Sequence, residues 1–507
     1  NRYSEIMAER VSELLDSLPS SVDVIGSLHE IKTILNSLHP STLKEIVPNV
    51  SFNTVFDCIN SSESEVIEAS SDVLQQLLQA LEPLVVLTQF QTELILGMSH
   101  SNVKVRKLCL KQILCVAEND GSDLVPCEDV LIQVVRCLGD ETLEVALLAA
   151  KILTTLGQNS AGVKVLFSGV ILEELTSVME KSDIIRYRVF EMVVNVASSS
   201  NKALTFASQA GFLNQLVNEI QKDDILIQLN CIELLKDLAL HSHGLAYLEQ
   251  QGVVTKLEIM MSQCDENPLM GFLLPGLIKF FGNVARIHPN EICDQFKAFT
   301  NTLFGLVTSP DQSLKGIAIE TVGVIGERPE GKLALEKMSN QMDNAVKVIG
   351  GAIKSSPEEV RSRAIESASN LMALKLEDHT MELLAITENW FNRLIPKPLE
   401  LLLEIVQQPL LELRVPTLTI ISHLAVQPWG QTMLNNQPGF NEYILNRSTE
   451  NTKEGKELKF LIAKNLIDSP SVPEIFGRPY LLRLREYHRE GPFYVRAQAE
   501  VATEEDS

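Results

Sequence analysis

The stretch from Ser208 to Met261 decides the fold of this chain, and it reads SQAGFLNQLVNEIQKDDILIQLNCIELLKDLALHSHGLAYLEQQGVVTKLEIMM. Gly211 follows a short helical run and precedes the apolar residues of a second helix. After a polar break, a longer helix carries apolar residues on one face at spacings of three and four: Ile225, Leu229, Ile232, Leu235, Leu238 and Ala239. Gly252 then opens the next copy. A unit of this kind cannot bury its own apolar face, so neighbouring copies must stack, as they do in a solenoid.

The residues that end the long helices recur at a nearly constant interval, and we call them anchors. They are Ala117, Gly157, Ala197, Ala239, Ala285, Gly326, Met372, Ala425 and Ile467, with a further copy ending near Ala80 and a degenerate first copy at 27–38. The glycine before the middle helix recurs at Gly169, Gly211, Gly252 and Gly439. Repeats of about 40–47 residues are typical of armadillo and HEAT proteins, and three helices per repeat favour armadillo. We therefore predict an all-α, right-handed superhelical solenoid of about eleven armadillo/HEAT-like repeats.

Breaks in the repeat pattern predict four regions. They are N-terminal capping helices at 1–40, a repeat array at 41–469, a C-terminal cap at 470–490 and a disordered tail at 491–507. Pro310 and Pro357 each follow a serine, and we predict that they are the first residues of long helices, where a missing N–H costs nothing. Because the chain begins at Asn1 rather than Met, we expect its N-terminus to be trimmed or incomplete.

Composition excludes several classes of function. The formal net charge of −23 disfavours nucleic acid and anionic membranes as partners and favours a basic protein. No apolar run approaches the length of about 18 residues that spans a membrane. The eight cysteines form no CxxC pair, so we expect reduced thiols without metal in a cytoplasmic, or also nuclear, protein: Cys58, Cys109, Cys115, Cys127, Cys137, Cys231, Cys264 and Cys293.

Motifs of catalysis are missing from the sequence. It has no phosphate-binding loop of the GxxxxGK[ST] type, no GxGxxG, no HExxH and no GxSxG. His241 and His243 are two residues apart, so they do not share a helix face, and a solvated turn is the better interpretation than a metal site. We expect no enzymatic activity and no cofactor.

Two rows of residues keep a constant distance from the anchors. The first row lies two residues before each anchor: Cys115, Thr155, Asn195, Asp237, Asn283, Val324, Asn370, His423 and Asn465. The second row lies four residues earlier: Lys111, Lys151, Glu191, Glu233, Lys279, Glu320, Glu366, Thr419 and Leu461. Residues at i and i+4 share a helix face, so the two rows lie side by side.

In armadillo proteins this face lines the concave groove, where Asn clamps an extended peptide; nuclear-import adaptors carry Trp in the second row. Here Glu takes several of those positions, and neither Trp390 nor Trp429 falls in the row. We therefore predict a partner-binding surface of acidic character, made of Glu191, Asn195, Glu233, Asp237, Asn283, Glu320, Glu366 and Asn370. The alternative is that the Glu residues are solvated and the Asn residues bond neighbouring helix ends.

A basic island stands apart from these rows, close to the C-terminus. It consists of Arg478, Arg483, Arg485, His488 and Arg489. In so acidic a chain, these residues are expected either to pair with neighbouring repeats or to contact a partner.

Five runs resemble one known family. They are SDIIRYRVFEMVVNVA (182–197), LPGLIKFFGNVA (274–285), TENWF (387–391), QPWGQTMLNNQPGFNEYILNRS (427–448) and EIFGRPYLLRLREYHREGPFYVR (474–496). They resemble the 26S proteasome non-ATPase regulatory subunit 5 family, and the resemblance extends from Leu28 to the C-terminus.

The resemblance implies a non-catalytic chaperone that helps to assemble the base of the proteasome's regulatory particle. Such a chaperone binds the C-terminal domain of one AAA+ ATPase subunit, in a module with a second ATPase and the large non-ATPase scaffold, and leaves before the mature particle works. It is expected to be a monomer on its own. The alternative function is an armadillo-type adaptor in transport or signalling, which grips an extended peptide.

Overall fold

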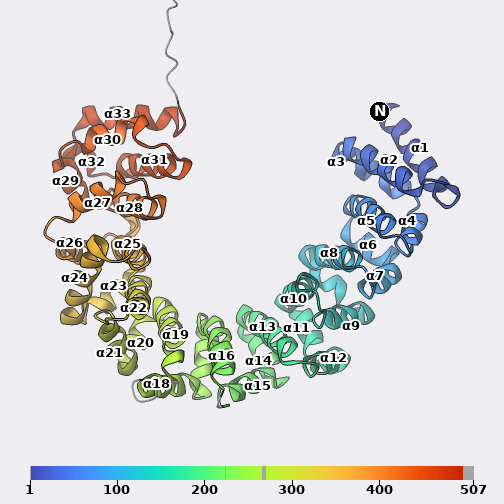
Figure 1. Ribbon diagram of the computed structural model, residues 1–507, viewed down its shortest axis with the longest axis horizontal. Helices are drawn as coiled ribbons and strands as arrows, with labels where there is room; N and C mark the ends of the chain where they lie inside the picture. The colour runs from blue at the N-terminus through green and yellow to red at the C-terminus, as the bar shows by residue number, and fades with distance from the viewer. Residues whose placement is uncertain (1, 223, 265–269, 495–507) are drawn as a thin grey trace, which may run out of the picture. The chain divides into compact units, whose positions relative to one another are not determined.

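The computed structural model shows an all-helical protein (Figure 1). It describes residues 2–222, 224–264 and 270–494, and these contain 33 α-helices and no strand. The chain divides into two compact units, Asn1–Gln251 (unit 1) and Gly252–Ser507 (unit 2), each of which is described by itself. Within the described residues, no helix combines the length and the apolar character that crossing a membrane requires.

Unit 1 is built from three layers of helices (Figure 1). The long helices each pack on the next one along the chain, and they are α2 (Val24–Ser37), α5 (Ser64–Gln79), α8 (Val103–Asp120), α10 (Leu143–Gln158), α13 (Asp183–Ser199) and α16 (Ile225–Ala239). The middle helices of the repeats form a second layer, on the side of unit 1 opposite to the long helices: α7 (Gln91–Met98), α9 (Glu128–Cys137), α12 (Gly169–Met179) and α15 (Phe212–Glu219). The third layer consists of the short helices α6 (Pro83–Gln89), α11 (Ser160–Leu166), α14 (Asn201–Gln209) and α17 (Ser242–Gln250). The unit begins with α1 (Arg2–Ser17), α3 (Pro40–Ile46) and α4 (Asn53–Cys58).

Unit 2 repeats the same plan. Its long helices are α19 (Leu274–Ile287), α22 (Gln312–Ile325), α25 (Glu358–Met372), α28 (Leu411–Leu424) and α31 (Lys453–Asp468), and α33 (Arg478–Glu490) packs on the last of them. The middle helices are α18 (Val253–Gln263), α21 (Lys297–Leu306), α24 (Ser339–Ser355), α27 (Pro398–Val406) and α30 (Phe440–Leu445). The first helices of its repeats are α20 (Pro289–Gln295), α23 (Pro329–Glu336), α26 (Met381–Leu394), α29 (Pro428–Asn436) and α32 (Val472–Ile475).

The predicted repeat is confirmed in both units. Six long helices in unit 1 and five in unit 2 make eleven, and the anchors lie at or close to their C-terminal ends. The predicted glycine turns are also present, because Gly169, Gly211, Gly252 and Gly439 all have positive φ angles, between 57° and 90°. Glycine adopts this left-handed conformation without the steric cost that a Cβ would add.

Two predicted helix starts are wrong. α22 begins at Gln312 and not at Pro310, because the side chain of Asp311 caps it by accepting hydrogen bonds from the backbone N–H groups of Ser313 (2.8 Å) and Leu314 (3.1 Å). α25 begins at Glu358, and Pro357 precedes it with φ of −53° and ψ of 152°, outside the helical region. Residues 495–507 of the predicted tail lie outside the described part of the chain.

Small residues at the anchors or one turn before them let successive long helices approach closely. A Cβ placed on Gly157 of α10 would come within 2.6 Å of both γ-methyl groups of Val196 on α13. In unit 2, a Cβ on Gly323 of α22 would lie 2.5 Å from the Cα of Ser367 on α25. The apolar stripes of the long helices meet along these contacts, and the opposite stripe of each helix remains at the surface.

The exposed face of the long helices

The long helices lie along one face of each unit (Figure 1), which we call the long-helix face. Helix geometry determines which residues reach it. On α13, Glu191 and Asn195 are exposed, whereas the residues between and beyond them are buried in the contacts with the neighbouring helices: Met192, Val193, Val194, Val196 and Ala197. The i, i+4 spacing that predicted two neighbouring rows therefore holds here.

In unit 1, four of the predicted site residues lie on this face. Glu191 and Asn195 are exposed, and neither has an ion pair or hydrogen-bond partner among the described residues. Glu233 is exposed but forms an ion pair with Lys236 on its own helix. Asp237 is half-buried, and this partial burial raises the pKa of its carboxyl group above the ordinary value. Glu191 is thus the carboxylate of the set in unit 1 that no cation offsets.

In unit 2, the other four predicted residues have different environments. Glu320 accepts a hydrogen bond of 3.0 Å from Arg363, which reaches it from the next long helix, α25. Asn283 donates its side-chain amide to the carbonyl of Lys279 on its own helix, at 2.9 Å. The carbonyl of Asn370 accepts from the buried Lys332. Glu366 is exposed, and the described part of unit 2 offers it no ion pair.

Two further members of the first row hold the helices together. His423 Nδ1 lies 3.0 Å from the carbonyl oxygen of Ser369, and Asn465 Nδ2 donates to the carbonyl of Ser422 at 2.9 Å. These bonds connect α25 to α28 and α28 to α31. Burial lowers the pKa of His423 to about 4, so the ring is neutral at physiological pH. At these two positions the row residues bond neighbouring helices, as the alternative to a partner-binding surface describes.

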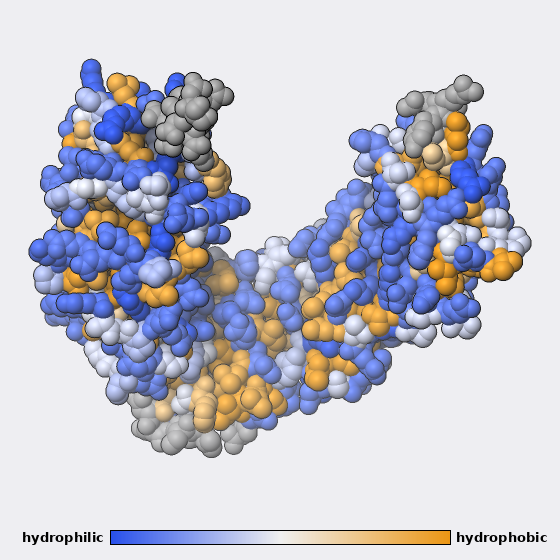
Figure 2. Space-filling model, turned by 45° about the horizontal axis from the view of Figure 1, so that its top comes forward, coloured by the Kyte–Doolittle hydropathy of each residue, from blue (hydrophilic) through white to orange (hydrophobic). Residues whose placement is uncertain are grey.

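Sequence reasoning missed a set of exposed apolar residues on the same face of unit 1. Ile184 on α13 is 70% exposed and Leu226 on α16 is 72% exposed. Each precedes a row residue, Glu191 or Glu233, by seven positions, which is about two helical turns and returns to the same side of the helix. Leu143 and Leu147 on α10 are exposed in the same way. Figure 2 shows apolar side chains reaching the surface among hydrophilic ones. The sequence does carry a signal for this set, because successive long helices each have an apolar residue in their first turn.

The basic island lies on α33. Arg478, Arg483, Arg485 and Arg489 are exposed, and none of them forms an ion pair within the described ranges. His488 instead stacks on Phe460 of α31, with ring centroids 4.6 Å apart. The expectation that the arginines pair with neighbouring repeats is therefore not met.

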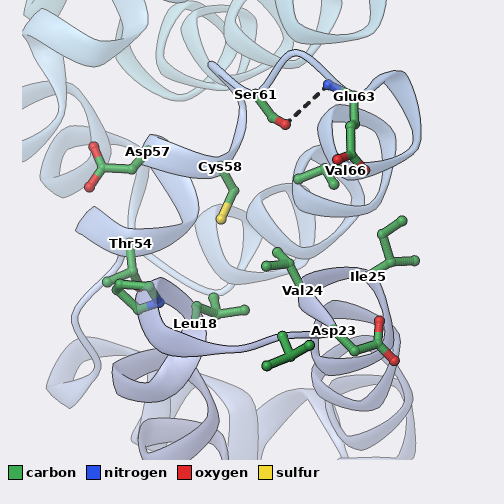
Figure 3. Close-up of a pocket in the computed structure, with 12 residues that line it drawn as sticks. Leu18, Asp23, Val24, Ile25, Thr54, Asp57, Cys58, Ser61, Glu63 and Val66 are labelled. Atoms are coloured by element: carbon green, nitrogen blue, oxygen red, sulfur yellow. Dashed lines mark hydrogen bonds between the residues drawn. The ribbon is translucent and has the colours of Figure 1, made fainter.

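An open pocket of about 410 Å³ lies near the start of unit 1, between α2, α4 and α5 (Figure 3). Its polar groups serve local structure: the Asp23 carboxylate accepts from the Gly26 N–H at 2.8 Å, and the Ser61 hydroxyl accepts from the Glu63 N–H at 3.1 Å. Burial raises the pKa of the Cys58 thiol in its wall, which makes that thiol a poorer nucleophile. Among the described residues, no hydrogen bond joins the Cys58 thiol to a carboxylate or an imidazole.

No disulfide bond joins any of the eight cysteines, all of which lie in the described ranges. Five of them are buried, and Cys115 is exposed on the long-helix face. Over the residues that are described, no group of three or more His, Cys, Asp and Glu side chains is arranged to hold a metal ion.

Comparison with known proteins gives a consistent result. Residues 7–506 match the profile of a family described as "Proteasome non-ATPase 26S subunit". The "26S proteasome non-ATPase regulatory subunit 5" of Homo sapiens is 34% identical over 501 residues, which are 98% of this chain and 99% of the human protein. The proteins of the same name from Bos taurus and Drosophila melanogaster are 35% and 25% identical, over 98% and 97% of this chain and 99% and 96% of their own. Among solved structures, an engineered protein aligns over 82% of this chain and 99% of its own, with 16% identity and a TM-score of 0.38.

Proposed function

This chain belongs to the 26S proteasome non-ATPase regulatory subunit 5 family, and from that premise we propose that it is a non-catalytic chaperone for assembly of the regulatory particle base. In this proposal it binds the C-terminal domain of an AAA+ ATPase subunit, in a module with a second ATPase and the large non-ATPase scaffold. It is released before the mature particle functions. The relatives' shared name, which describes a proteasome subunit without ATPase activity, supports the proteasomal part of this proposal.

One observation carries the proposed binding mode. The long-helix face of unit 1 combines Glu191, a carboxylate without an ion pair among the described residues, with the exposed apolar residues Ile184 and Leu226. A folded partner domain presents both basic and apolar groups over an area wide enough to touch several repeats. Apolar residues at the centre of an interface supply affinity, and charges around them mainly affect association rate and specificity.

We assign the predicted site residues to this contact within each unit. They are Glu191, Asn195, Glu233 and Asp237 in unit 1, and Asn283, Glu320, Glu366 and Asn370 in unit 2. Their contributions differ, because Glu233 and Glu320 already have basic partners within the protein. Glu191 and Glu366 are therefore expected to contribute most to the attraction of a basic surface.

The decisive experiment is a pull-down of the full chain with the C-terminal domains of the six proteasomal ATPases, each expressed separately. One domain should be captured, and Glu191→Lys with Glu366→Lys should weaken its binding and reduce the salt dependence. A matched control is Glu249→Lys with Glu404→Lys, which reverses one exposed carboxylate in each unit, away from the long-helix face. Capture of none of the domains would refute the proposed partner, and equal losses in both variants would refute the proposed face.

The second candidate is a peptide-binding adaptor, and the exposed, unengaged amide of Asn195 favours it. Against it, the side chains of Asn283, His423 and Asn465 in the same row are already engaged within the protein. Tight binding of a short basic peptide, with no capture of a folded ATPase domain, would establish the adaptor in place of the chaperone.

A further inference from the structure

The helix that ends unit 2, α33, has two chemically different faces. Tyr480, Leu481, Leu484 and Tyr487 are buried, and the helix packs against α31 and its neighbours. The opposite side carries Arg478, Leu482, Arg485 and Arg489 at spacings of four, three and four, which place them in one line along the helix. We call these four residues the α33 stripe.

The stripe is exposed and positively charged. Leu482 is 64% exposed, and the three arginines are exposed as well. No carboxylate in the described part of the chain forms an ion pair with these arginines. Arg483 and Glu486 flank the stripe and are also exposed. The only acidic residue of α33 with an ion pair is Glu490, which is bound by Arg447 at 3.0 Å.

The α33 stripe keeps three arginines in one line without ion pairs in an acidic protein. A chain with a net charge of −23 has many carboxylates that could neutralise arginines, as Glu320 does with the partly buried Arg363 and Glu174 with the exposed Arg136. Arginine presents a planar fork of donors that matches a carboxylate with two parallel hydrogen bonds. Three guanidinium groups in line with one exposed leucine form a surface that is complementary to acidic side chains and to one apolar side chain.

We propose that the α33 stripe binds a short acidic segment of a partner protein, with an apolar residue between its carboxylates. The distance from Arg478 to Arg489 is about 16 Å at 1.5 Å per residue. An extended peptide covers that distance with about five to six residues. Because successive side chains of an extended segment point to opposite sides, its first, third and fifth residues face the stripe. This gives an acidic residue opposite Arg478, a leucine-like residue opposite Leu482 and an acidic residue between Arg485 and Arg489. This site does not depend on the long-helix face or on the proposed ATPase partner.

The probe is a fluorescein-labelled peptide with the sequence Gly-Glu-Ser-Leu-Ser-Glu-Gly, and binding to the full chain is followed by fluorescence polarisation. Arg478→Glu with Arg485→Glu and Arg489→Glu should weaken binding by about tenfold or more, and raised salt should weaken binding to the unaltered chain. Leu482→Ala should weaken it by a few-fold without a folding defect, because the side chain of Leu482 is exposed. Circular dichroism and thermal unfolding check that each variant is folded.

The matched control is Lys279→Glu with Lys347→Glu and Lys354→Glu, which makes the same change in net charge at exposed lysines elsewhere in unit 2. It should change the dissociation constant for the peptide by no more than about twofold, because distant exposed charges are screened. A loss as large as that of the arginine variant would overturn the proposal in favour of a general charge effect.

Three other outcomes also overturn it. A peptide with Gln in place of Glu that binds equally well would exclude carboxylate recognition. A single-stranded oligonucleotide that binds as tightly as the peptide would make the stripe a general polyanion site. Binding that appears only when the chain is truncated after Tyr494 would show that the stripe is covered by the acidic residues of 495–507 and not by a partner.

Discussion

The side-chain ammonium of Lys332 lies 3.0 Å from the main-chain carbonyl oxygen of Asn370 and also donates to the carbonyl of Gly326. It thereby joins the C-terminal ends of α22 and α25, whose last carbonyls have no partner within their own helices. Gln431 joins the C-terminal ends of α28 and α31 in the same way. Its side-chain amide donates to the Ala425 carbonyl at 2.9 Å and to the Ser469 hydroxyl at 2.7 Å. Both residues follow an anchor by six positions, so buried polar side chains join neighbouring repeats at equivalent places in unit 2.

Lys332 should make the stability of unit 2 depend on pH. The lysine is fully buried, and burial lowers its pKa from 10.5 to about 7. Between these two values the unfolded chain binds more protons than the folded one, so stability rises with pH across this window. Lys332→Met should remove the contribution of Lys332 to this rise, which is on the order of a few kcal/mol in the free energy of unfolding.

The measurement is urea unfolding, followed by circular dichroism at several pH values from 6 to 10, for the unaltered chain and the variant. Only the difference between the two is informative, because Lys459, with a pKa lowered to about 8, titrates in the same window. Parallel pH profiles for the two proteins would show that Lys332 is not the group responsible.

Gly157 and Val196 should be energetically coupled. A Cβ at position 157 would lie 2.6 Å from the Val196 methyl groups, so Gly157→Ala should destabilise the protein by about 1–3 kcal/mol through overpacking. Val196→Ala removes those methyl groups and should reduce the penalty when it is combined with Gly157→Ala. A double-mutant cycle measured by chemical unfolding gives the coupling energy, and strictly additive effects would contradict the close contact.

Gly211 should be required for its backbone conformation alone. Its φ is 90°, and a Cβ built on it would have no atom within 4 Å. Gly211→Ala is therefore expected to cost about 1 kcal/mol through backbone strain. Gly211→Asn should cost less, because Asn tolerates positive φ better than Ala. Thermal unfolding of the two variants tests this order, and the reverse order would argue against the left-handed turn.

Glu450 should be essential to the stability of the C-terminal repeats. Its side chain is only 2% exposed, accepts a 2.8 Å bond from the Tyr443 hydroxyl and pairs with Arg414. Glu450→Gln leaves the charge of Arg414 unpaired in a largely buried site, and such losses cost about 3–5 kcal/mol. The free energy of unfolding measures the effect. Replacing Glu404, an exposed residue of the same unit, with Gln serves as the control and should change it little.

Ile184 and Leu226 should matter for partner binding and not for folding. Both are exposed, so Ile184→Asp with Leu226→Asp should leave the unfolding temperature nearly unchanged. The same variant should lose most of its binding in the pull-down with the ATPase domains, since the exposed apolar residues are the proposed anchors. Unchanged capture would show that the partner does not use this part of the face.

Periodicity in the sequence was enough to predict the all-α fold, the number of long helices and the turns at Gly211 and Gly439, because each repeat contacts mainly its neighbours and shows the same local pattern. It also placed Glu191 and Glu366 correctly at the surface, since the i, i+4 spacing within one helix determines which residues share a face. The sequence alone did not reveal which carboxylates remain without a cation. Arg363 reaches Glu320 from the next long helix, and their separation of 43 residues has no local signature.

The repeat and its exposed register therefore follow from the amino-acid sequence alone, because both depend on residues within one helix of each other. The tertiary structure decided the environment of each side chain, because that depends on which neighbouring repeat packs against it. Lys332 illustrates the difference: in sequence it is an ordinary lysine of a short helix, yet the stacking of α25 buries its ammonium against the carbonyl of Asn370. The arginines of α33 show the converse. No further long helix packs over them in the described chain, so Arg478, Arg485 and Arg489 remain exposed.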